Sequence, residues 1–136
     1  MTHVSPPPEP ALDDEERSLL AKGVDEFSRR RFYECHDTLE ELWSGLRGPS
    51  RDFFQGLIQA AVGFYHLGNG NREGARRLFD RALARLERYP PRFAGVEAGP
   101  LRASVARFRD ALAAGEEPPA EDPPRIGLSM SPRGDA

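Results

Sequence analysis

The sequence predicts an all-α fold, a multihelical bundle of about five helices around a buried central helix at residues 51–68. Residues 53–67 contain no charged side chain, although 30% of the chain is charged. A helix that is apolar nearly all round belongs in a core or a membrane, and the two glutamines and the histidine in this stretch favour a core. On both sides of it, apolar residues recur at the 3–4 spacing that is typical of amphipathic helices.

The first helix is expected at residues 13–30, after a proline-rich leader at residues 1–12. The consecutive acids at residues 13–16 suit the positive end of a helix. Leu20, Val24 and Phe27 follow at helical spacing and supply its apolar face. A basic joint at residues 29–31 then leads into the second helix.

The second helix is expected at residues 32–46, before the glycines and the proline of residues 45–49 end it. Its apolar stripe, with Trp43 on the shoulder, consists of Phe32, Cys35, Leu39, Leu42 and Leu46. His36 and Glu40 lie one turn apart, and we expect them at the rim between core and water. Further round the helix, the residues expected to face solvent are Asp37, Thr38 and Glu41.

The central helix is expected to begin after Ser50 as its N-cap and to end at the turn of residues 68–70. Asn71 is the expected N-cap of a fourth helix at residues 72–89, which has the cleanest amphipathic pattern in the chain. The prolines at positions 90 and 91 stop that helix.

A fifth helix is expected from Leu101 to about residue 114, which completes a single domain at residues 13–114. The remaining tail, residues 115–136, holds five of the thirteen prolines and should lack regular structure. Within it, Ile126, Leu128 and Met130 alternate, which favours an extended segment lying on the bundle.

A constant shift along the chain aligns the first two predicted helices with the next two. It places Gly23 on Gly63 and Leu39 on Phe79. The four helices would then form two similar antiparallel hairpins stacked together, and the spacing also resembles the tetratricopeptide pattern of protein-interaction modules. Chance agreement between two helical periodicities is the alternative interpretation.

Composition excludes several classes of function. A net charge of −3 and a pI near 5.7 give no basic surface for nucleic acid or an anionic membrane. The single Cys35 excludes an intrachain disulfide and is typical of a reducing compartment. The N-terminal sequence has no secretory pattern, so we expect a cytoplasmic protein. The sequence also contains no phosphate loop and no dinucleotide fingerprint, and it leaves homo-oligomerisation open.

Polar residues of the central helix fall on one side of it, at about 100° per residue. They are Gln55, Gln59 and His66, with Asp52 beside them. Buried polar groups need partners, so we expect this side to meet His36 and Glu40 of the second helix. Tyr33, Asp37 and Trp43 would lie near this polar site. The site is either a structural hydrogen-bond network or the wall of a pocket for a small ligand.

A metal site is a third interpretation of the same residues. His36, Glu40 and His66 could supply three ligands to a divalent cation and leave a fourth position for water. Such a centre would hydrolyse a substrate through the bound water. Without a metal, His36 and Glu40 could act as a general acid–base pair. Cys35 points into the core stripe, so a thiolate–imidazole pair with His36 is not expected.

Two long segments resemble a known family. Residues 32–43, FYECHDTLEELW, are similar to the pattern F-F-E-A-H-E-x-L-E-x-x-W, and residues 51–66 are similar to R-x-F-F-Q-G-L-I-Q-x-A-x-x-x-Y-H. Both patterns belong to the domain of unknown function 309, a family of small bacterial and archaeal proteins, and the resemblance covers about residues 20–87. Asp37 departs from the pattern, which usually has Glu there.

The resemblance implies a multihelical bundle around a buried central helix, in agreement with the helices expected above. The family is sometimes labelled a predicted metal-dependent hydrolase, and its activity is not established. Three functions thus remain open: a structural or small-ligand site, a metal-dependent hydrolase, and a tetratricopeptide-like interaction module.

Overall fold

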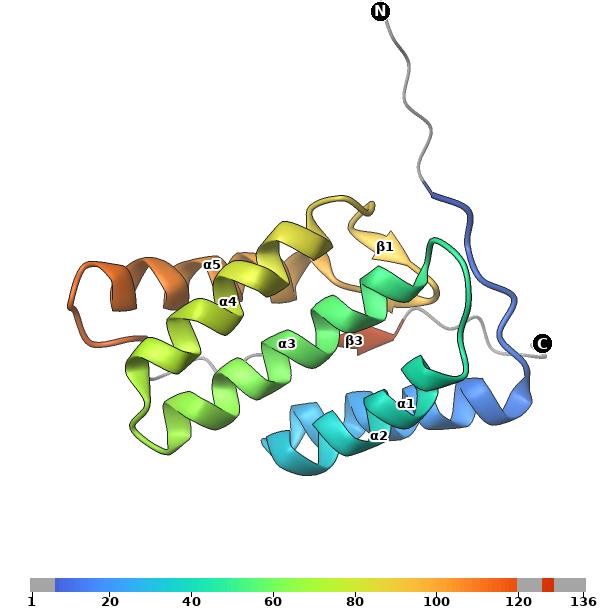
Figure 1. Cartoon of the computed structure of the whole chain (residues 1–136), viewed down its shortest axis with the longest axis horizontal. Coiled ribbons are helices and arrows are strands. Elements are labelled where there is room, and N and C mark those ends of the chain that lie inside the picture. The colour runs from blue at the N-terminus through green and yellow to red at the C-terminus, as the bar shows by residue number, and fades with distance from the viewer. Residues whose placement is uncertain (1–6, 120–125, 129–136) are drawn as a thin grey trace, which may run out of the picture.

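The computed structural model describes residues 7–119 and 126–128. In this part of the chain, five helices follow one another in sequence, and they carry the fold (Figure 1). Their bounds are α1 Asp14–Ser28, α2 Phe32–Ser44, α3 Arg51–Gly68, α4 Arg72–Leu86 and α5 Gly99–Ala113. The all-α prediction is therefore confirmed, and the central helix occupies the predicted residues 51–68.

The helix α3 lies in the middle of the bundle, between α2 and α4 (Figure 1). One of its side chains joins most of the fold. The Phe64 ring lies 5.9 Å from Phe27 of α1, 4.7 Å from Phe79 of α4 and 5.0 Å from Phe108 of α5, measured between centroids. Aromatic rings at such distances, mostly edge to face, add to the stability that their buried area provides.

The hairpins α1–α2 and α3–α4 have matching backbones in the alignment that places Gly23 on Gly63. The first helix of each ends at Ser28 or Gly68, and the second begins at Phe32 or Arg72. The connecting turns are also equivalent. Arg31 N donates to Glu26 O at 2.8 Å in the first, and Asn71 N donates to His66 O at 2.9 Å in the second.

Both hairpins bring their helices together at a glycine. A Cβ atom on Gly23 would lie 2.6 Å from Leu39 Cδ2, and one on Gly63 would lie 2.5 Å from Phe79 Cε1. Only glycine permits so close an approach without a shift of the neighbour. These two glycines and their two partners are the pairs that the sequence alignment matches, which favours two similar hairpins over chance agreement between two periodicities.

Helix ends agree with the prediction in part. Asp13 and Glu16 form a capping box on α1, and Asn71 accepts a hydrogen bond from Gly74 N at 2.9 Å on α4. The prediction that Ser50 caps α3 is wrong, because Ser50 has helical dihedrals and its side chain makes no capping bond. An N-cap residue needs an extended backbone to turn its side chain back onto the helix.

A three-stranded antiparallel sheet was not predicted. It consists of β1 Arg92–Phe93, β2 Val96–Glu97 and β3 Gly127–Leu128, in that order. The turn between β1 and β2 has φ values of 56° and 77° at Ala94 and Gly95, as a two-residue hairpin turn requires. Ile126 is 3% exposed, so the predicted extended segment does lie on the bundle at residues 126–128. Met130 lies outside the described residues.

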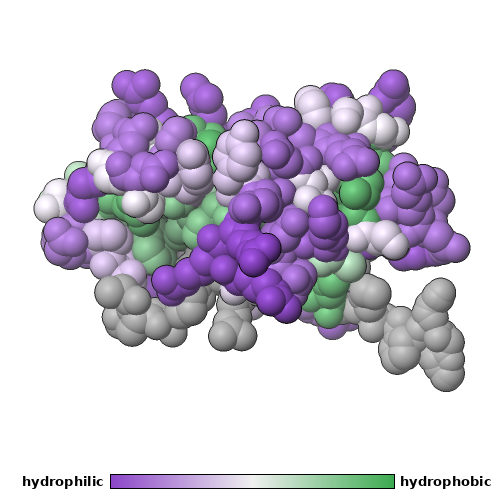
Figure 2. Space-filling model, turned by 90° about the horizontal axis from the view of Figure 1, so that it is seen from below, coloured by the Kyte–Doolittle hydropathy of each residue, from purple (hydrophilic) through white to green (hydrophobic). Residues whose placement is uncertain are grey.

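The surface on the side of α1 and α2 is mostly hydrophilic, with hydrophobic residues visible between the polar ones (Figure 2). Within the described ranges, the search for a helix long and apolar enough to cross a lipid bilayer finds none.

Candidate functional site

A pocket of about 210 Å³ lies between the N-terminal half of α2 and the C-terminal half of α3. Its lining is mostly aromatic and comprises Phe32, Tyr33, His36, Val62, Tyr65 and His66. The two helices are antiparallel neighbours, so residues just after the start of α2 face residues near the end of α3. Three of the six lining residues, Tyr33, His36 and His66, are among the predicted site residues.

Two tyrosines at the pocket remain accessible. The side chains of Tyr33 and Tyr65 are 53% and 40% exposed, and they are the two exposed large hydrophobic residues of the described chain. Their ring centroids lie 5.6 Å apart. Phe32 stacks on the core ring of Phe64 at 5.5 Å, which fixes the pocket to the rigid part of the bundle. Exposed aromatic rings of this kind are enriched at binding sites.

His36 lies between two carboxylates of its own helix. Its Nε2 is 3.2 Å from Glu40 Oε2, and its Nδ1 is 3.4 Å from Asp37 Oδ1. A neutral imidazole has one N–H and can donate to one of these carboxylates, whereas an imidazolium can donate to both. Both carboxylates are exposed and keep further oxygen lone pairs for a ligand. The predicted rim position is therefore correct for His36, which is partly buried, whereas Glu40 is exposed.

The prediction that Gln59 meets His36 and Glu40 is wrong. Gln59 is buried, and its Oε1 accepts a hydrogen bond from Arg85 Nη1 of α4 at 3.3 Å. Asp52 also faces α4: its carboxylate lies 3.6 Å from Arg85 Nε of that helix and 2.8 Å from Nη2 of Arg88, which follows the helix. The polar side of α3 faces the boundary between α2 and α4. Some of its polar groups therefore form hydrogen bonds or ion pairs on the α4 side, and only His66 reaches the pocket. Gln55, in between, is partly exposed and outside the pocket lining.

Trp43 lies at the other end of the α2–α3 contact. The guanidinium carbon of Arg51 stacks over its ring at 3.6 Å from the centroid. In this cation–π interaction, an arginine of the protein itself covers the Trp43 ring at that end of the α2–α3 interface. Trp43 is therefore separated from the pocket residues with which the sequence analysis grouped it.

The proposed metal ligands do not assemble. In the ranges that the structure describes, no three or more His, Cys, Asp or Glu side chains are grouped so that they could hold a metal ion. His36 and His66 line the same pocket, whereas Glu40 lies against His36 and outside the lining.

Two other residues of α2 have clear positions. Thr38, expected to face solvent, is 5% exposed, because α1 covers it: its Cγ2 lies 3.6 Å from where a Cβ on Gly23 would be. Cys35 is fully buried, as expected. Burial raises the pKa of its thiol to about 12, with a smaller contribution from the carboxylate of Glu26. A neutral, buried thiol is a poor nucleophile.

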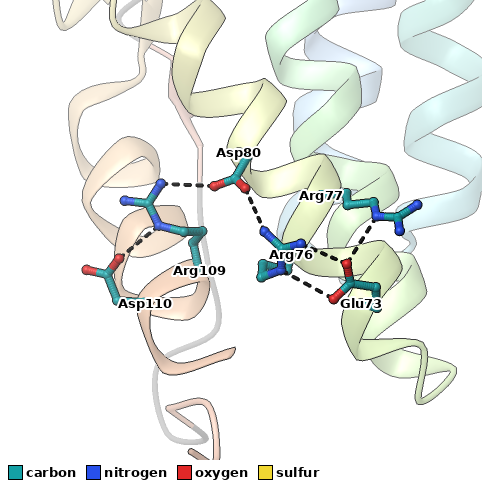
Figure 3. Close-up of polar contacts among 6 residues, drawn as sticks. All are labelled: Glu73, Arg76, Arg77, Asp80, Arg109 and Asp110. Carbon is teal, nitrogen blue, oxygen red and sulfur yellow. Dashed lines mark hydrogen bonds and ion pairs between the residues drawn. The ribbon is translucent and has the colours of Figure 1, made fainter. Parts of the chain in front are cut away.

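An ion-pair network joins α4 to α5 (Figure 3). Asp80 accepts hydrogen bonds from Arg76 Nη1 at 3.0 Å and from Arg109 Nη1 of α5 at 3.1 Å. Arg76 and Arg77 also bind Glu73, and the hydrogen bond from Arg76, followed by that from Arg77, lowers the pKa of the Glu73 carboxyl. The network was not predicted, and its charges are largely paired, which indicates a structural link.

Sequence reasoning missed the place of three residues in the pocket, namely Phe32, Val62 and Tyr65. The available signal was the antiparallel pairing of α2 with α3. If Trp43 near the end of α2 pairs with Arg51 at the start of α3, Tyr33, ten residues earlier, must lie near position 61 of α3, within about one turn of Val62 and Tyr65. Pairing the helices in this way identifies the pocket, whereas a helical projection of α3 alone does not.

Comparison with known proteins agrees with these motifs. Residues 20–78 match the family described as "Domain of unknown function (DUF309)". An uncharacterised protein of Aquifex aeolicus (strain VF5) is 28% identical over 89 residues, which are 65% of this chain and 27% of that protein. The uncharacterised protein YpuF of Bacillus subtilis (strain 168) is 35% identical over 65 residues, 47% of this chain and 37% of YpuF.

In both cases the alignment spans well under half of the relative's own length. The matched segment contains α2, α3, the pocket between them and the first half of α4. On these matches, the helical segment at residues 20–78 belongs to the family of the domain of unknown function DUF309.

Proposed function

We propose that the protein is a binding module and that the pocket between α2 and α3 receives one side chain of a peptide segment from a partner protein. The observation that carries the proposal is the pair of exposed tyrosines, Tyr33 and Tyr65, at a pocket whose base packs on the core. A purely structural role for this site would not require either ring to stay accessible to solvent.

The size of the pocket favours a side chain over a larger ligand. Pockets for drug-sized molecules usually measure about 300–1,000 Å³, whereas this one measures about 210 Å³. Its lining combines four aromatic or apolar residues with two histidines. Such a lining offers van der Waals contact to an inserted group and a small number of polar contacts that orient it.

The helical hairpins support a role in protein binding. Stacked helical hairpins build extended surfaces that other repeat proteins use for partners. Besides its two equivalent hairpins, this chain has α5, which ends as α1 and α3 do: Gly115 has a φ of 74°, and Glu116 N donates to Ala111 O at 2.8 Å. The helix α5 therefore takes the place of the first helix of a third repeat and covers α4.

The proposal is tested by titrating the ¹⁵N-labelled protein with a panel of short blocked peptides that carry apolar, aromatic, acidic and basic side chains. Binding at the pocket should shift the amide signals of Tyr33, His36 and Tyr65. The double variant Tyr33→Ala/Tyr65→Ala should bind the best peptide at least about tenfold more weakly, since each buried aromatic contact contributes about 1 kcal/mol or more.

A matched control is Tyr33→Phe/Tyr65→Phe, which keeps both rings and should retain binding. Circular dichroism of each variant checks that the helices remain folded, as expected for side chains that are about half exposed. If no peptide of the panel shifts the pocket signals of the folded protein, the proposed function is wrong.

A further inference from the structure

We infer that the side chain received by this pocket is cationic, an arginine or lysine of the partner peptide; this inference rests on the proposed function. The argument comes from the equivalence of the two hairpins. In the alignment that places Gly23 on Gly63, His36 corresponds to Arg76 and Glu40 corresponds to Asp80. The contacts of Arg76 and Asp80 therefore show which partners these two positions of the fold bind when their charges are paired within the protein.

In the second hairpin, Asp80 has two guanidinium partners (Figure 3). One is Arg76, a turn earlier on the same helix, at 3.0 Å. The other is Arg109, which comes from α5, the next helix in the stack, at 3.1 Å. A carboxylate at this position thus binds one cation from its own helix and one from the helix that follows.

In the first hairpin, the partner from the same helix is retained, whereas the partner from the following helix has no counterpart. His36 Nε2 lies 3.2 Å from Glu40 Oε2 and takes the role of Arg76. Within the described chain, Glu40 has no ion pair to α3, the helix that corresponds to α5. Beside His36, where α2 contacts α3, the helix α3 instead contributes Val62, Tyr65 and His66 to an open pocket.

The aromatic rings of the pocket suit a cation. A guanidinium or ammonium group is attracted to the face of a tyrosine ring within about 6 Å of its centroid. The protein uses this contact itself at the far end of the same helix pair, where Arg51 stacks on Trp43 at 3.6 Å. No such internal cation is found over Tyr33 or Tyr65 among the described residues.

The charges of α2 favour the same occupant. This helix carries no lysine or arginine, and its exposed acids Asp37 and Glu40 lie beside His36 of the pocket. Arg30 and Arg31 precede the helix at its N-terminal end. Asp37 and Glu40 lie on the other side of Tyr33 along the chain, so a cation over the tyrosine ring would lean away from the arginines and towards these carboxylates.

The test compares two blocked tripeptides, glycine–arginine–glycine and glycine–citrulline–glycine, by ¹⁵N NMR titration of the full chain at low salt. Citrulline has nearly the shape of arginine and lacks its charge. The arginine peptide should shift the signals of Tyr33, His36 and Tyr65 and bind about fivefold or more tightly than the citrulline peptide. This preference should shrink at 0.5 M salt, because salt screens exposed charges.

Two variants with the same change of charge locate the contact. Glu40→Gln should weaken binding of the arginine peptide about two- to fivefold. Glu34→Gln is the matched control: it removes an equal charge from another side of α2 and should leave binding unchanged. A ratio near one between the arginine and citrulline peptides overturns the inference of a cation.

The outcomes separate this inference from the proposed function. If both tripeptides bind equally at the pocket, or if only an apolar peptide of the panel binds there, the pocket is a binding site and the cationic occupant is wrong. If nothing in the panel, including the arginine peptide, shifts the pocket signals, both proposals are wrong.

Discussion

The hairpins α1–α2 and α3–α4 have equivalent backbones and opposite chemistry on their second helices. Four positions of α2 outside its buried stripe carry Tyr33, His36, Asp37 and Glu40, and the equivalent positions of α4 carry Glu73, Arg76, Arg77 and Asp80. On α4, these residues form an ion-pair network that reaches α5. On α2, Tyr33 and His36 line a pocket, and Asp37 and Glu40 lie beside His36. The same four positions of the hairpin thus form ion pairs within the protein in the second hairpin and remain accessible to a partner in the first.

The largest expected effect concerns the glycine contacts that both hairpins share. Gly63→Ala should destabilise the protein by about 2–3 kcal/mol, because the new Cβ would overlap the buried, rigid Phe79 ring. Gly23→Ala should cost less, about 1–2 kcal/mol, since the overlapped atoms belong to the more adaptable Leu39 side chain. Urea unfolding followed by circular dichroism measures both. Equal costs would show that the two contacts are equally rigid.

The second effect concerns Cys35, whose equivalent in the other hairpin is the fully buried Ala75. The pKa of Cys35 is raised from 9.0 to about 12 in the folded protein. The unfolded chain loses this proton above pH 9 and the folded chain keeps it, so unfolding becomes more favourable as pH rises from 9 to 12. The loss of stability should approach about 1.4 kcal/mol per pH unit.

Cys35→Ala makes the first hairpin resemble the second at this position and should remove that part of the pH dependence. The difference between the two proteins, measured by urea unfolding at pH 8 and pH 10, isolates the thiol from tyrosines and the lysine that titrate in the same range. Parallel curves for the two proteins would contradict the raised pKa. Ellman's reagent should also fail to react with Cys35 until the protein unfolds.

The third effect compares the turns of the hairpins. Arg30 and Gly70 occupy equivalent positions and have φ values of 63° and 78°. A residue with a side chain loses about 1 kcal/mol of stability in a left-handed backbone conformation, whereas glycine adopts this conformation without that loss. Arg30→Gly should therefore stabilise the protein by up to about 1 kcal/mol, and Gly70→Ala should destabilise it by a similar amount. Thermal unfolding of both variants provides the measurement, and a destabilising Arg30→Gly would mean that Arg30 makes compensating contacts.

The smallest effect concerns the exposed ion pairs of the second hairpin. Asp80→Asn should destabilise the protein by less than about 1 kcal/mol, since its partners are only partly buried and water screens the charges. The effect should decrease in 0.5 M salt. Glu40→Gln is the equivalent change in the first hairpin and should change stability even less. A larger loss there would assign a structural role to the residues around the pocket.

The sequence predicts the helices well, because strong local signals define them. The uncharged stretch and the surrounding glycines define α3 to the residue, and the alignment of Gly23 with Gly63 finds the equivalent hairpins. The small sheet is not predicted because a strand of two residues is too short to show an alternating hydrophobic pattern in the sequence.

The candidate site is predicted less completely. His36, Tyr33 and His66 are found, since their spacing on each helix is informative. Gln59 is misplaced because the projection of one helix does not show whether a residue that lies between two neighbouring helices contacts α2 or α4. Its hydrogen-bond partner is Arg85 of α4. Tyr65 is missed because its role depends on a ring from another helix.

The Phe64 side chain has a consequence for folding. In most helical repeat proteins each unit contacts only its neighbours, so terminal units can fray while the others stay intact. Here the middle unit is bordered on both sides, and its single Phe64 ring contacts Phe27 of the first unit and Phe108 of α5. Loss of either terminal helix would expose that ring to water, so the stack should melt in one cooperative transition, and neither hairpin should persist as an isolated fragment.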